Sequence, residues 1–530
     1  MKPHQTLLFI LAVFAVLSFF MLIFPENGFQ ITSDLNLKFT SFSKVFGQNE
    51  VENADISNIV AGADIEDIYS EELQATKLDS AIVDGKVVYF QVSKISIDSL
   101  KQPLDFPNND RSLLSNFFSS LIEARNNGQN IRVMHYGDSQ IEGDRMTSYI
   151  RFRMQAQFGG TGVGLTPVRQ AYDFGIPMKP ESSSNWRRYA IYGNQDQTME
   201  KKQYGVLASF VRFSPRFNDE AAVDTANYTH NVQTISTIDS IRREVQSPTY
   251  EAWVTFSKTR SAYESSQQFS TCKMYYSNNK RPVEVKVFSG ENLIATDTLF
   301  PTEDFKVAKW HFPSQPQEVT LRFSGKDSPD IYGVSFESDN GIFVDNIGMR
   351  GNSGTIFTKM DLQQLSQMYQ ELNVKLLILQ FGGNVIPYNS AEGYVNYSGW
   401  LYSQFSALKN AIPGVSIIVI GPADMSKKEG SSYVTHHNVE PVRDAVKNAA
   451  FSAGCAYWDM YEAMGGKNSM ASWVFANPSL AEKDFTHFNP RGARLISSMF
   501  YDALMYEYNY YIENVYSGDV AAGTTSRMGK

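Results

Sequence analysis

The stretch RVMHYGDSQIEGDRM, residues 132–146, changes in character at its Gly-Asp-Ser sequence. The residues before this point are largely apolar and predict a strand buried in a sheet, whereas those after it are polar and charged and predict the opening of a helix. Ser139 therefore lies where a strand ends and a helix begins. One interpretation is a helix cap that satisfies free backbone N–H groups, and the other is a nucleophile held at the tip of a strand. Ser139 alone does not distinguish a cap from a nucleophile, so the two interpretations must be tested against residues elsewhere in the chain.

Short apolar runs like the one before Ser139 recur along the chain and alternate with helical stretches. The runs predict buried strands at 131–136, 342–348, 375–381, 415–421 and 455–459. Helices are predicted at about 110–128, 357–370, 392–410, 438–453 and 490–508, the last with Asn489 as its cap and Pro490 at its first position. This alternation predicts an α/β fold, a flavodoxin-like doubly wound parallel sheet with helices on both faces.

One long interruption, roughly residues 200–335, separates the first strand–helix unit from the second strand. Its runs, such as YEAWVTFSK and RPVEVKVFSG, alternate apolar and polar residues and are bounded by Gly, Asn, Asp and Pro. This pattern predicts an all-β sandwich inserted into the α/β domain. Trp253 and Trp310 lie in the insertion, where each could stack on a sugar ring or pack in the core of the sandwich.

Residues 7–24 are apolar except for Ser18, follow Lys2 and precede Glu26. The run is long enough to span a bilayer, and no small-x-small cleavage site follows it. We expect an uncleaved signal-anchor rather than a cleaved signal peptide or a buried core helix, with the bulk of the protein outside the cytoplasm. The predicted organisation is an anchor at 1–27, a stalk or accessory region at 28–105, the α/β domain in two parts at 106–199 and 336–516 around the insertion at 200–335, and a disordered tail at 517–530.

The composition excludes several classes of function. The net charge is −9 and no run of basic residues is present, so we expect no nucleic-acid partner. Cys272 and Cys455 are far apart, which excludes a disulfide framework and a cysteine-rich metal site and predicts free thiols. His436 and His437 lack a carboxylate or cysteine at ligand spacing and are interpreted as a surface pair. The sequence therefore predicts no metal and no cofactor.

Polar residues follow several of the predicted strands or precede the last helix, at the edge where open α/β sheets place their sites. They are Ser139, Gly351, Asn384, Asp484 and His487. Taken singly, each has an ordinary role, as a helix cap, a turn glycine or asparagine, a carboxylate approaching a helix, or a surface histidine. Their convergence on one edge of one predicted sheet argues for a shared site.

These residue types form a coherent set for acyl transfer. A serine hydroxyl becomes a nucleophile when a base takes its proton, and histidine suits that role near neutral pH. A carboxylate three residues before the histidine can accept the other imidazole N–H and hold the required tautomer. The backbone N–H groups of Ser139 and Gly351 and the side-chain amide of Asn384 would stabilise the oxyanion.

With these residues in this order, the chain resembles the SGNH (GDSL-type) hydrolase family over about residues 130–170 and 340–508. The blocks are GDSQ, NIGMRGNSG, GGNV and DFTH. The resemblance implies catalytic Ser139, His487 and Asp484, with an oxyanion hole from Ser139, Gly351 and Asn384. Val385 replaces the usual aspartate of the third block. The segment GDSQIEGDRMTSYIRFRMQAQFGGTGVG is most similar to bacterial peptidoglycan and polysaccharide O-acetylesterases, some of which carry an inserted β-sandwich resembling a carbohydrate-binding module, although Gln140 stands where those enzymes commonly have histidine.

The resemblance and the anchor together predict a membrane-attached esterase on the periplasmic or cell-surface side of a bacterial envelope. It would remove O-acetyl groups from peptidoglycan or another glycan through an acyl-serine intermediate. One alternative is an O-acetyltransferase with the same triad, which would require a membrane-bound partner that supplies the acyl group. A lipase or lysophospholipase is a further alternative, and a non-catalytic glycan-binding scaffold is the alternative from another class.

Overall fold

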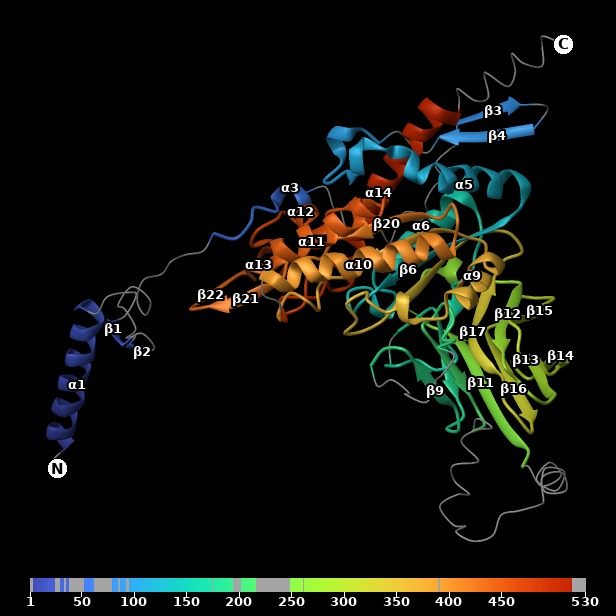
Figure 1. Cartoon of the computed structure of the whole chain (residues 1–530), viewed down its shortest axis with the longest axis horizontal. Helices are drawn as coiled ribbons and strands as arrows, with labels where there is room; N and C mark the ends of the chain where they lie inside the picture. Colours follow the sequence, from blue (N-terminus) through green and yellow to red (C-terminus); the bar gives the residue numbers. More distant parts are fainter. Residues whose placement is uncertain are drawn as a thin grey trace, which may run out of the picture.

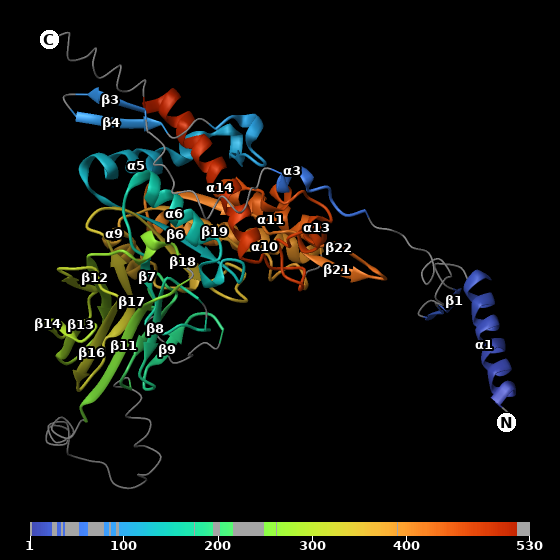
Figure 2. The ribbon, with the colours of Figure 1, turned by 180° about the vertical axis from the view of Figure 1, so that it is seen from behind.

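The computed structural model describes residues 3–23, 29–32, 35–37, 52–61, 79–83, 86–91, 95–173, 175–193, 202–215, 248–260, 262–388 and 391–516. The tail predicted at 517–530 lies outside the described residues. Figures 1 and 2 show the α/β domain in the middle of the molecule and the inserted sandwich packed against one end of it.

The α/β domain is built on a six-stranded sheet in the order β18-β6-β19-β20-β23-β5. The five strands β18 to β23 pair in parallel, and the short β5 pairs antiparallel with β23 at the edge. Counted along the chain, the parallel strands have the order 2-1-3-4-5, which is the flavodoxin-like doubly wound order. The predicted fold class is therefore confirmed. The strands are β5 (Leu104–Asp105), β6 (Asn130–Gly137), β18 (Gly341–Gly348), β19 (Val374–Gln380), β20 (Ser416–Ile420) and β23 (Ala456–Trp458).

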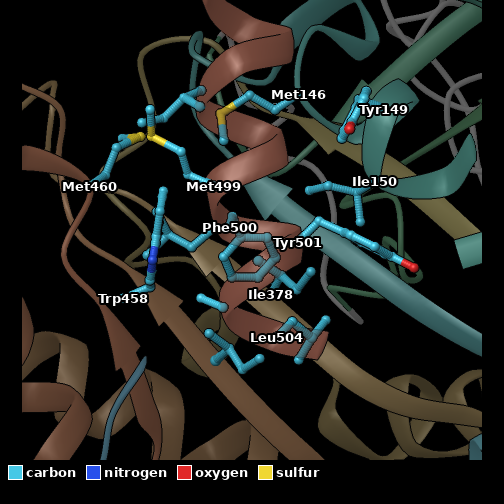
Figure 3. Packing of buried hydrophobic residues seen from close by; sticks show 14 of the residues in the cluster. Met146, Tyr149, Ile150, Ile378, Trp458, Met460, Met499, Phe500, Tyr501 and Leu504 are labelled. Atoms are coloured by element: carbon cyan, nitrogen blue, oxygen red, sulfur yellow. The ribbon is translucent and has the colours of Figure 1, made fainter. Parts of the chain in front are cut away.

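Helices cover both faces of this sheet because successive strand residues point to opposite sides. On β6, Ile131 and Val133 point to one face, where they pack in a core with α5 (Ser115–Asn127), α6 (Thr147–Phe158) and α14 (Pro490–Tyr511). Met134 and Tyr136 point to the other face, where they pack in a core with α9 (Leu362–Glu371), α10 (Ala391–Ala411) and α11 (Val439–Ser452). Figure 3 shows the first core, in which Phe500 of α14 lies near Trp458 of β23, at 5.4 Å between ring centroids.

The last helix begins as predicted. The side chain of Asn489 accepts hydrogen bonds from the N–H groups of Arg491 and Gly492, and Pro490 occupies the first helical position. Two short helices, α12 (Met460–Ala463) and α13 (Ser469–Phe475), and the hairpin of β21 (Ser426–Glu429) and β22 (Ser432–Thr435) complete the domain on the side that carries the carboxyl ends of the strands.

The insertion contains two antiparallel sheets. One has the order β15-β12-β17-β10-β9 with β7 paired to β17, and the other has the order β14-β13-β16-β11-β8. Their strands are β7 (Gly164–Thr166), β8 (Met178–Ser182), β9 (Arg187–Ala190), β10 (Ser209–Arg212), β11 (Tyr250–Lys258), β12 (Thr271–Ser277), β13 (Val283–Ser289), β14 (Asn292–Leu299), β15 (Lys306–His311), β16 (Glu318–Gly325) and β17 (Asp330–Glu337).

The sandwich therefore begins at β7, ahead of the boundary at residue 200 that the sequence suggested. Strands β7, β8 and β9 were assigned to the first part of the α/β domain because their residues do not alternate clearly between apolar and polar. The sequence of β8 is MKPES and that of β9 is RRYA. Such short, charged strands are recognisable only through the longer strands with which they pair.

A buried ionic network joins the sandwich to the parallel sheet. Arg132 of β6 pairs with Asp345 of β18 at 2.7 Å and with Glu337 at the end of β17. Asp345 also accepts a hydrogen bond from the N–H of Leu165 in β7, at 2.8 Å. Because buried charges are stable only when paired, this network sets how the sandwich sits on the edge of the sheet near β18.

The N-terminal part contains helix α1 (Pro3–Ile23), which has a mean hydropathy of 2.9 over its most apolar window and could cross a membrane by length and composition. A signal sequence would share these properties. Region 28–105 also contains β1 (Phe29–Thr32), β2 (Leu35–Leu37), α3 (Ser57–Val60), β3 (Asp79–Val83) and β4 (Lys86–Gln91). Within this region, Ile56 and Ile59 are buried in the α/β core, and the side chain of Asn468 donates to the carbonyl of Glu52. Part of the predicted stalk therefore belongs to the folded body.

Both cysteines are buried and free, as predicted. Burial raises the pKa of the Cys455 thiol to about 12 and raises the pKa of the Cys272 thiol further. Neither thiol ionises near neutral pH, which argues against a chemical role for either side chain.

Candidate active site

Ser139 lies in the turn after β6, at the carboxyl end of the strand that pairs with β18 and β19. Its Oγ is 2.8 Å from Nε2 of His487. Helix α6 begins only at Thr147, after a 3₁₀ turn, η4 (Glu142–Asp144), in which Gly143 has a φ of 69°. The interpretation of Ser139 as a helix cap is therefore wrong, because an intervening turn separates the serine from the helix. The hydroxyl points to the histidine.

Asp484 orients the histidine through two oxygens. Its Oδ2 is 2.7 Å from Nδ1 of His487, and its Oδ1 accepts the backbone N–H groups of Thr486 and His487 at 3.0 Å each. Partial burial raises the pKa of Asp484, but the hydrogen bonds from His487 and Thr486 outweigh it and lower the pKa to about 2. An ionised Asp484 accepts a hydrogen bond from the Nδ1–H of His487, which leaves Nε2 free to accept the proton of Ser139.

Two backbone donors beside the serine have no acceptor. Among the described residues, neither the N–H of Ser139 nor that of Gly351 donates a hydrogen bond. The turn at 349–352 is held against the serine turn because the N–H of Met349 donates to the carbonyl of Gly137 at 2.8 Å. Because these N–H groups have no acceptor among the described residues and lie near the end of a strand, they are available as donors to an oxyanion.

Asn384 stands across from this turn. Its Nδ2 donates to the carbonyl of Asn352 at 3.1 Å, and an amide nitrogen has a second N–H available. Gly351 is the exposed neighbour of Asn352 and has a φ of 76°, a backbone conformation that favours glycine. At the position where the family has an aspartate, the N–H of Val385 donates to the carbonyl of Gly382 at 3.0 Å, so the loop closes through its backbone.

A cavity of about 250 Å³ opens beside the serine, and we refer to it as the catalytic cavity. Ser139, His487, Thr486 and Asn384 contribute polar atoms to its lining, whereas Gly351 does not line it. Its apolar walls come mainly from the loops after β19 and β20, with one residue from α12: Phe381, Pro387, Tyr388, Pro422, Ala423, Met425 and Met460. Sequence reasoning missed these walls, although Phe381 ends one predicted strand and Pro422 directly follows another at the same edge of the sheet.

Gln140 joins the serine turn to the histidine loop. Its Nε2 donates to the carbonyl of Thr486 at 2.6 Å, and its backbone N–H donates to Oδ1 of Asp138 at 3.0 Å. Asp138 thereby braces the turn, and burial raises its pKa to about 6. Arg145 adds a third restraint, because its Nη1 donates to the carbonyl of Ser139 at 2.8 Å.

The charged residues that follow the serine form a buried turn. Glu142 and Asp144 are both buried. Glu142 pairs with Arg350 at 2.5 Å, and Asp144 pairs with Arg151 at 2.6 Å. The 3₁₀ turn folds against the end of β18, where these arginines neutralise its carboxylates.

The two tryptophans of the insertion differ in their surroundings. Trp310 is 5% exposed and packs in the core of the sandwich, so it has no face to offer a sugar ring. Trp253 is 41% exposed on β11 and stays a candidate for glycan binding. The rings of His436 and His437 stack at 4.5 Å, and within the described part of the chain no three His, Cys, Asp or Glu side chains gather as metal ligands would.

No family model matches the sequence, and no curated protein matches it in sequence. Among solved structures, a peptidoglycan O-acetylesterase aligns with a TM-score of 0.53 and 17% identity over 76% of this chain and 97% of that chain. An acetyl xylan esterase aligns with a TM-score of 0.24 and 15% identity over 31% of this chain and 81% of that chain. A GDSL-like lipase from Bacteroides ovatus aligns with a TM-score of 0.20 and 9% identity over 61% of this chain and 96% of that chain. Both align too weakly to carry an argument. The first alignment establishes a shared fold. The α/β fold that the sequence predicted is therefore shared with this solved structure.

Proposed function

We propose that this protein is a serine esterase that removes O-acetyl groups from a glycan of the cell envelope. The observation that carries the proposal is the hydrogen-bonded chain from Ser139 Oγ through His487 to Asp484, with distances of 2.8 and 2.7 Å. This chain ends at a serine whose own N–H has no acceptor among the described residues. A nucleophile, its base, the orienting carboxylate and an oxyanion donor thus occupy one edge of the sheet.

The chemistry proceeds in two halves. Ser139 Oγ attacks the ester carbonyl carbon while Nε2 of His487 takes the hydroxyl proton, and the carbonyl oxygen becomes an oxyanion. The N–H groups of Ser139 and Gly351 and the free N–H of Asn384 stabilise that oxyanion. His487 then protonates the departing sugar oxygen, which leaves an acyl-serine. Water, deprotonated by His487, attacks the acyl-serine and releases acetate and the free serine.

The size and chemistry of the catalytic cavity support a small acyl group on a large alcohol. The wall is largely apolar beside Ser139, which suits a methyl group, and the cavity volume of about 250 Å³ leaves little room for a long acyl chain. The shared fold with a peptidoglycan O-acetylesterase supports a glycan as the alcohol. The apolar helix α1 supports attachment to a membrane, with the α/β domain on the extracytoplasmic side.

The test uses the full chain purified in detergent. We expect hydrolysis of 4-nitrophenyl acetate, and we expect the Ser139→Ala variant to lose at least about 10³-fold of that activity. Ser148→Ala, a change in the nearby helix α6, is the matched control and should keep the activity. A sulfonyl fluoride should add its mass to the peptide that contains Ser139. Equal rates for the wild type and Ser139→Ala would refute the proposal.

The fate of the acetyl group distinguishes an esterase from a transferase. Acetylated peptidoglycan and acetylated xylan are incubated with the protein, and the released acetate and the masses of the glycans are measured. We expect free acetate in an amount equal to the acetyl groups lost. Acetyl groups that reappear on a second glycan would identify a transferase, and preference for long-chain 4-nitrophenyl esters would identify a lipase.

A further inference from the structure

A second hollow lies where the sandwich meets the parallel sheet, and we refer to it as the junction hollow. Its lining combines the end of β18 and the turn η4 with residues of the sandwich around β7, β9 and β10. Figure 2 shows β7 beside β18 at this boundary. The lining contains none of Ser139, Asn384 and His487, so this hollow is distinct from the catalytic cavity.

The junction hollow has an excess of positive charge. Its lining includes four arginines and two carboxylates. Glu142 is paired with Arg350, and Asp144 is paired with Arg151. The remaining two arginines contact neutral acceptors: Arg188 donates to the hydroxyl of Tyr192 at 2.5 Å, and Arg169 donates to the carbonyl of Trp186. Neither pairs with a carboxylate of the described residues. Two guanidinium groups in the lining, an exposed one and a partly buried one, therefore have no carboxylate partner among the described residues.

Aromatic rings and apolar side chains complete the lining. The guanidinium of Arg350 lies 3.9 Å from the ring centre of Tyr172, and that of Arg188 lies 5.0 Å from the ring centre of Tyr192. Leu165 and Ile347 contribute apolar surface. Planar guanidinium groups held against rings are well oriented to bind a carboxylate through two parallel hydrogen bonds. The hollow has a volume of about 90 Å³, which suits one substituent of a sugar rather than a whole oligosaccharide.

The junction hollow lies within reach of the reacting serine. Glu142, in its lining, is three residues after Ser139, so their Cα atoms are at most about 11 Å apart. Arg350, also in the lining, is the residue before Gly351. A glycan whose ester is at Ser139 could therefore place a neighbouring unit at the junction hollow.

We propose that the junction hollow binds the carboxylate of an acidic sugar unit in the glycan substrate. This inference rests on the proposed function for the identity of the substrate, but the binding of an acidic sugar is measurable without any reaction. It makes the preferred substrate an acidic polymer, such as a uronic-acid or lactyl-bearing glycan, in place of a neutral one such as xylan.

The experiment measures binding to the full chain that carries Ser139→Ala, by calorimetry in low salt. The probes are trigalacturonate and the same trisaccharide with its carboxylates methyl-esterified. We expect tighter binding of the charged form by about tenfold or more, as one charge-assisted hydrogen bond provides. Adding Arg188→Gln or, in a separate protein, Arg169→Gln should weaken binding of the charged form by a similar factor. Arg322→Gln, on the exposed face of β16, is the matched control and should change nothing.

Equal affinity for the charged and esterified probes would overturn the inference. It would also be overturned if both Arg188→Gln and Arg169→Gln, shown by circular dichroism and thermal melting to be folded, bound the charged probe as Arg322→Gln does. These outcomes are separate from the failure of the proposed function, which would appear as absent hydrolysis of 4-nitrophenyl acetate by the wild-type chain.

Discussion

The catalytic cavity and the junction hollow are both lined by the turn that follows β6, but they are built from different chemistry. The catalytic cavity is lined by Ser139, whose N–H has no acceptor among the described residues, by one histidine and by an apolar wall. The junction hollow contains arginines, two of which lack a carboxylate partner among the described residues. The first arrangement suits a charge that develops during a reaction, and the second suits a charge that the ligand already carries. On our proposals, the turn after β6 therefore lies between a site where the ester reacts and a site where the substrate is bound.

The comparison makes a general prediction. Changes in the catalytic cavity should alter the rate of ester hydrolysis and leave the affinity for trigalacturonate unchanged, whereas changes in the junction hollow should alter that affinity. Four variants in or beside the catalytic cavity test this prediction, and their expected effects decrease from Asp484→Asn to Gln140→Ala. For each, the affinity for trigalacturonate is measured in parallel.

Asp484→Asn should have the largest effect. The amide keeps the shape of the side chain but removes the charge that holds the Nδ1 proton of His487, so the histidine can adopt the wrong tautomer. We expect kcat for 4-nitrophenyl acetate to fall by about 10³–10⁴-fold. Asp339→Asn, an exposed change outside the site, is the control. Retention of most of the wild-type rate would show that His487 does not need the carboxylate.

Asn384→Ala should come next. It removes the side-chain donor to the oxyanion but leaves the N–H groups of Ser139 and Gly351. The expected loss is about 10²–10³-fold in kcat with little change in KM, because the donor acts on the transition state. Steady-state kinetics on 4-nitrophenyl acetate measure this split. An effect confined to KM would instead assign Asn384 to substrate binding.

Asp138→Asn tests the buried carboxylate of the same turn. Because burial raises its pKa from 3.8 to about 6, the folded chain holds this proton more tightly than the unfolded chain does. The free energy of unfolding therefore falls as the pH rises from about 4 to about 6, and the loss of about 3 kcal/mol persists at higher pH. The asparagine variant lacks this loss.

The melting temperature measures that difference. Relative to the wild type, the melting temperature of Asp138→Asn should increase between pH 4 and pH 7. Asp484 has the opposite sign, because its lowered pKa of about 2 contributes stability above pH 4 that is lost as the pH falls toward 2. A difference between Asp138→Asn and wild type that stays constant across this range would contradict the assigned pKa.

Gln140→Ala should have the smallest effect of the four. The change removes the hydrogen bond to the carbonyl of Thr486 and loosens the histidine loop relative to Ser139. We expect kcat to fall by about tenfold with KM unchanged, and the rate of labelling of Ser139 by a sulfonyl fluoride to fall in parallel. Gln363→Ala, at the exposed start of α9, is the control. Unchanged labelling would show that Gln140 does not position the histidine.

The sequence predicted the positions of the buried strands and the candidate catalytic residues for a physical reason. Buried parallel strands are continuous apolar runs, and their carboxyl ends meet at one edge of the sheet. Residues such as Ser139 and Asn384 could thus be placed together although they lie far apart in the chain. The pairing of Asp484 with His487 is local, since the two lie three residues apart on one loop.

Other features could not be predicted from the sequence because they depend on contacts between segments that are far apart in the chain. The burial of Glu142 depends on Arg350, which is 208 residues later in the chain, and the hydrogen bond from Gln140 to Thr486 joins two loops that are 346 residues apart. The start of the sandwich at β7 was missed for the same reason. Short charged strands show their identity only through their partners.

The α/β class, the parallel sheet and the candidate triad residues could be predicted from the sequence. The hydrophobic periodicity and the residues at the strand ends are properties of short stretches of sequence. Only the tertiary structure shows that Ser139 does not cap helix α6, that Trp310 is core, and that arginines from the α/β domain and the sandwich surround one hollow. These outcomes depend on the packing of surfaces that are far apart in the chain, and local patterns carry no information about which surfaces will meet.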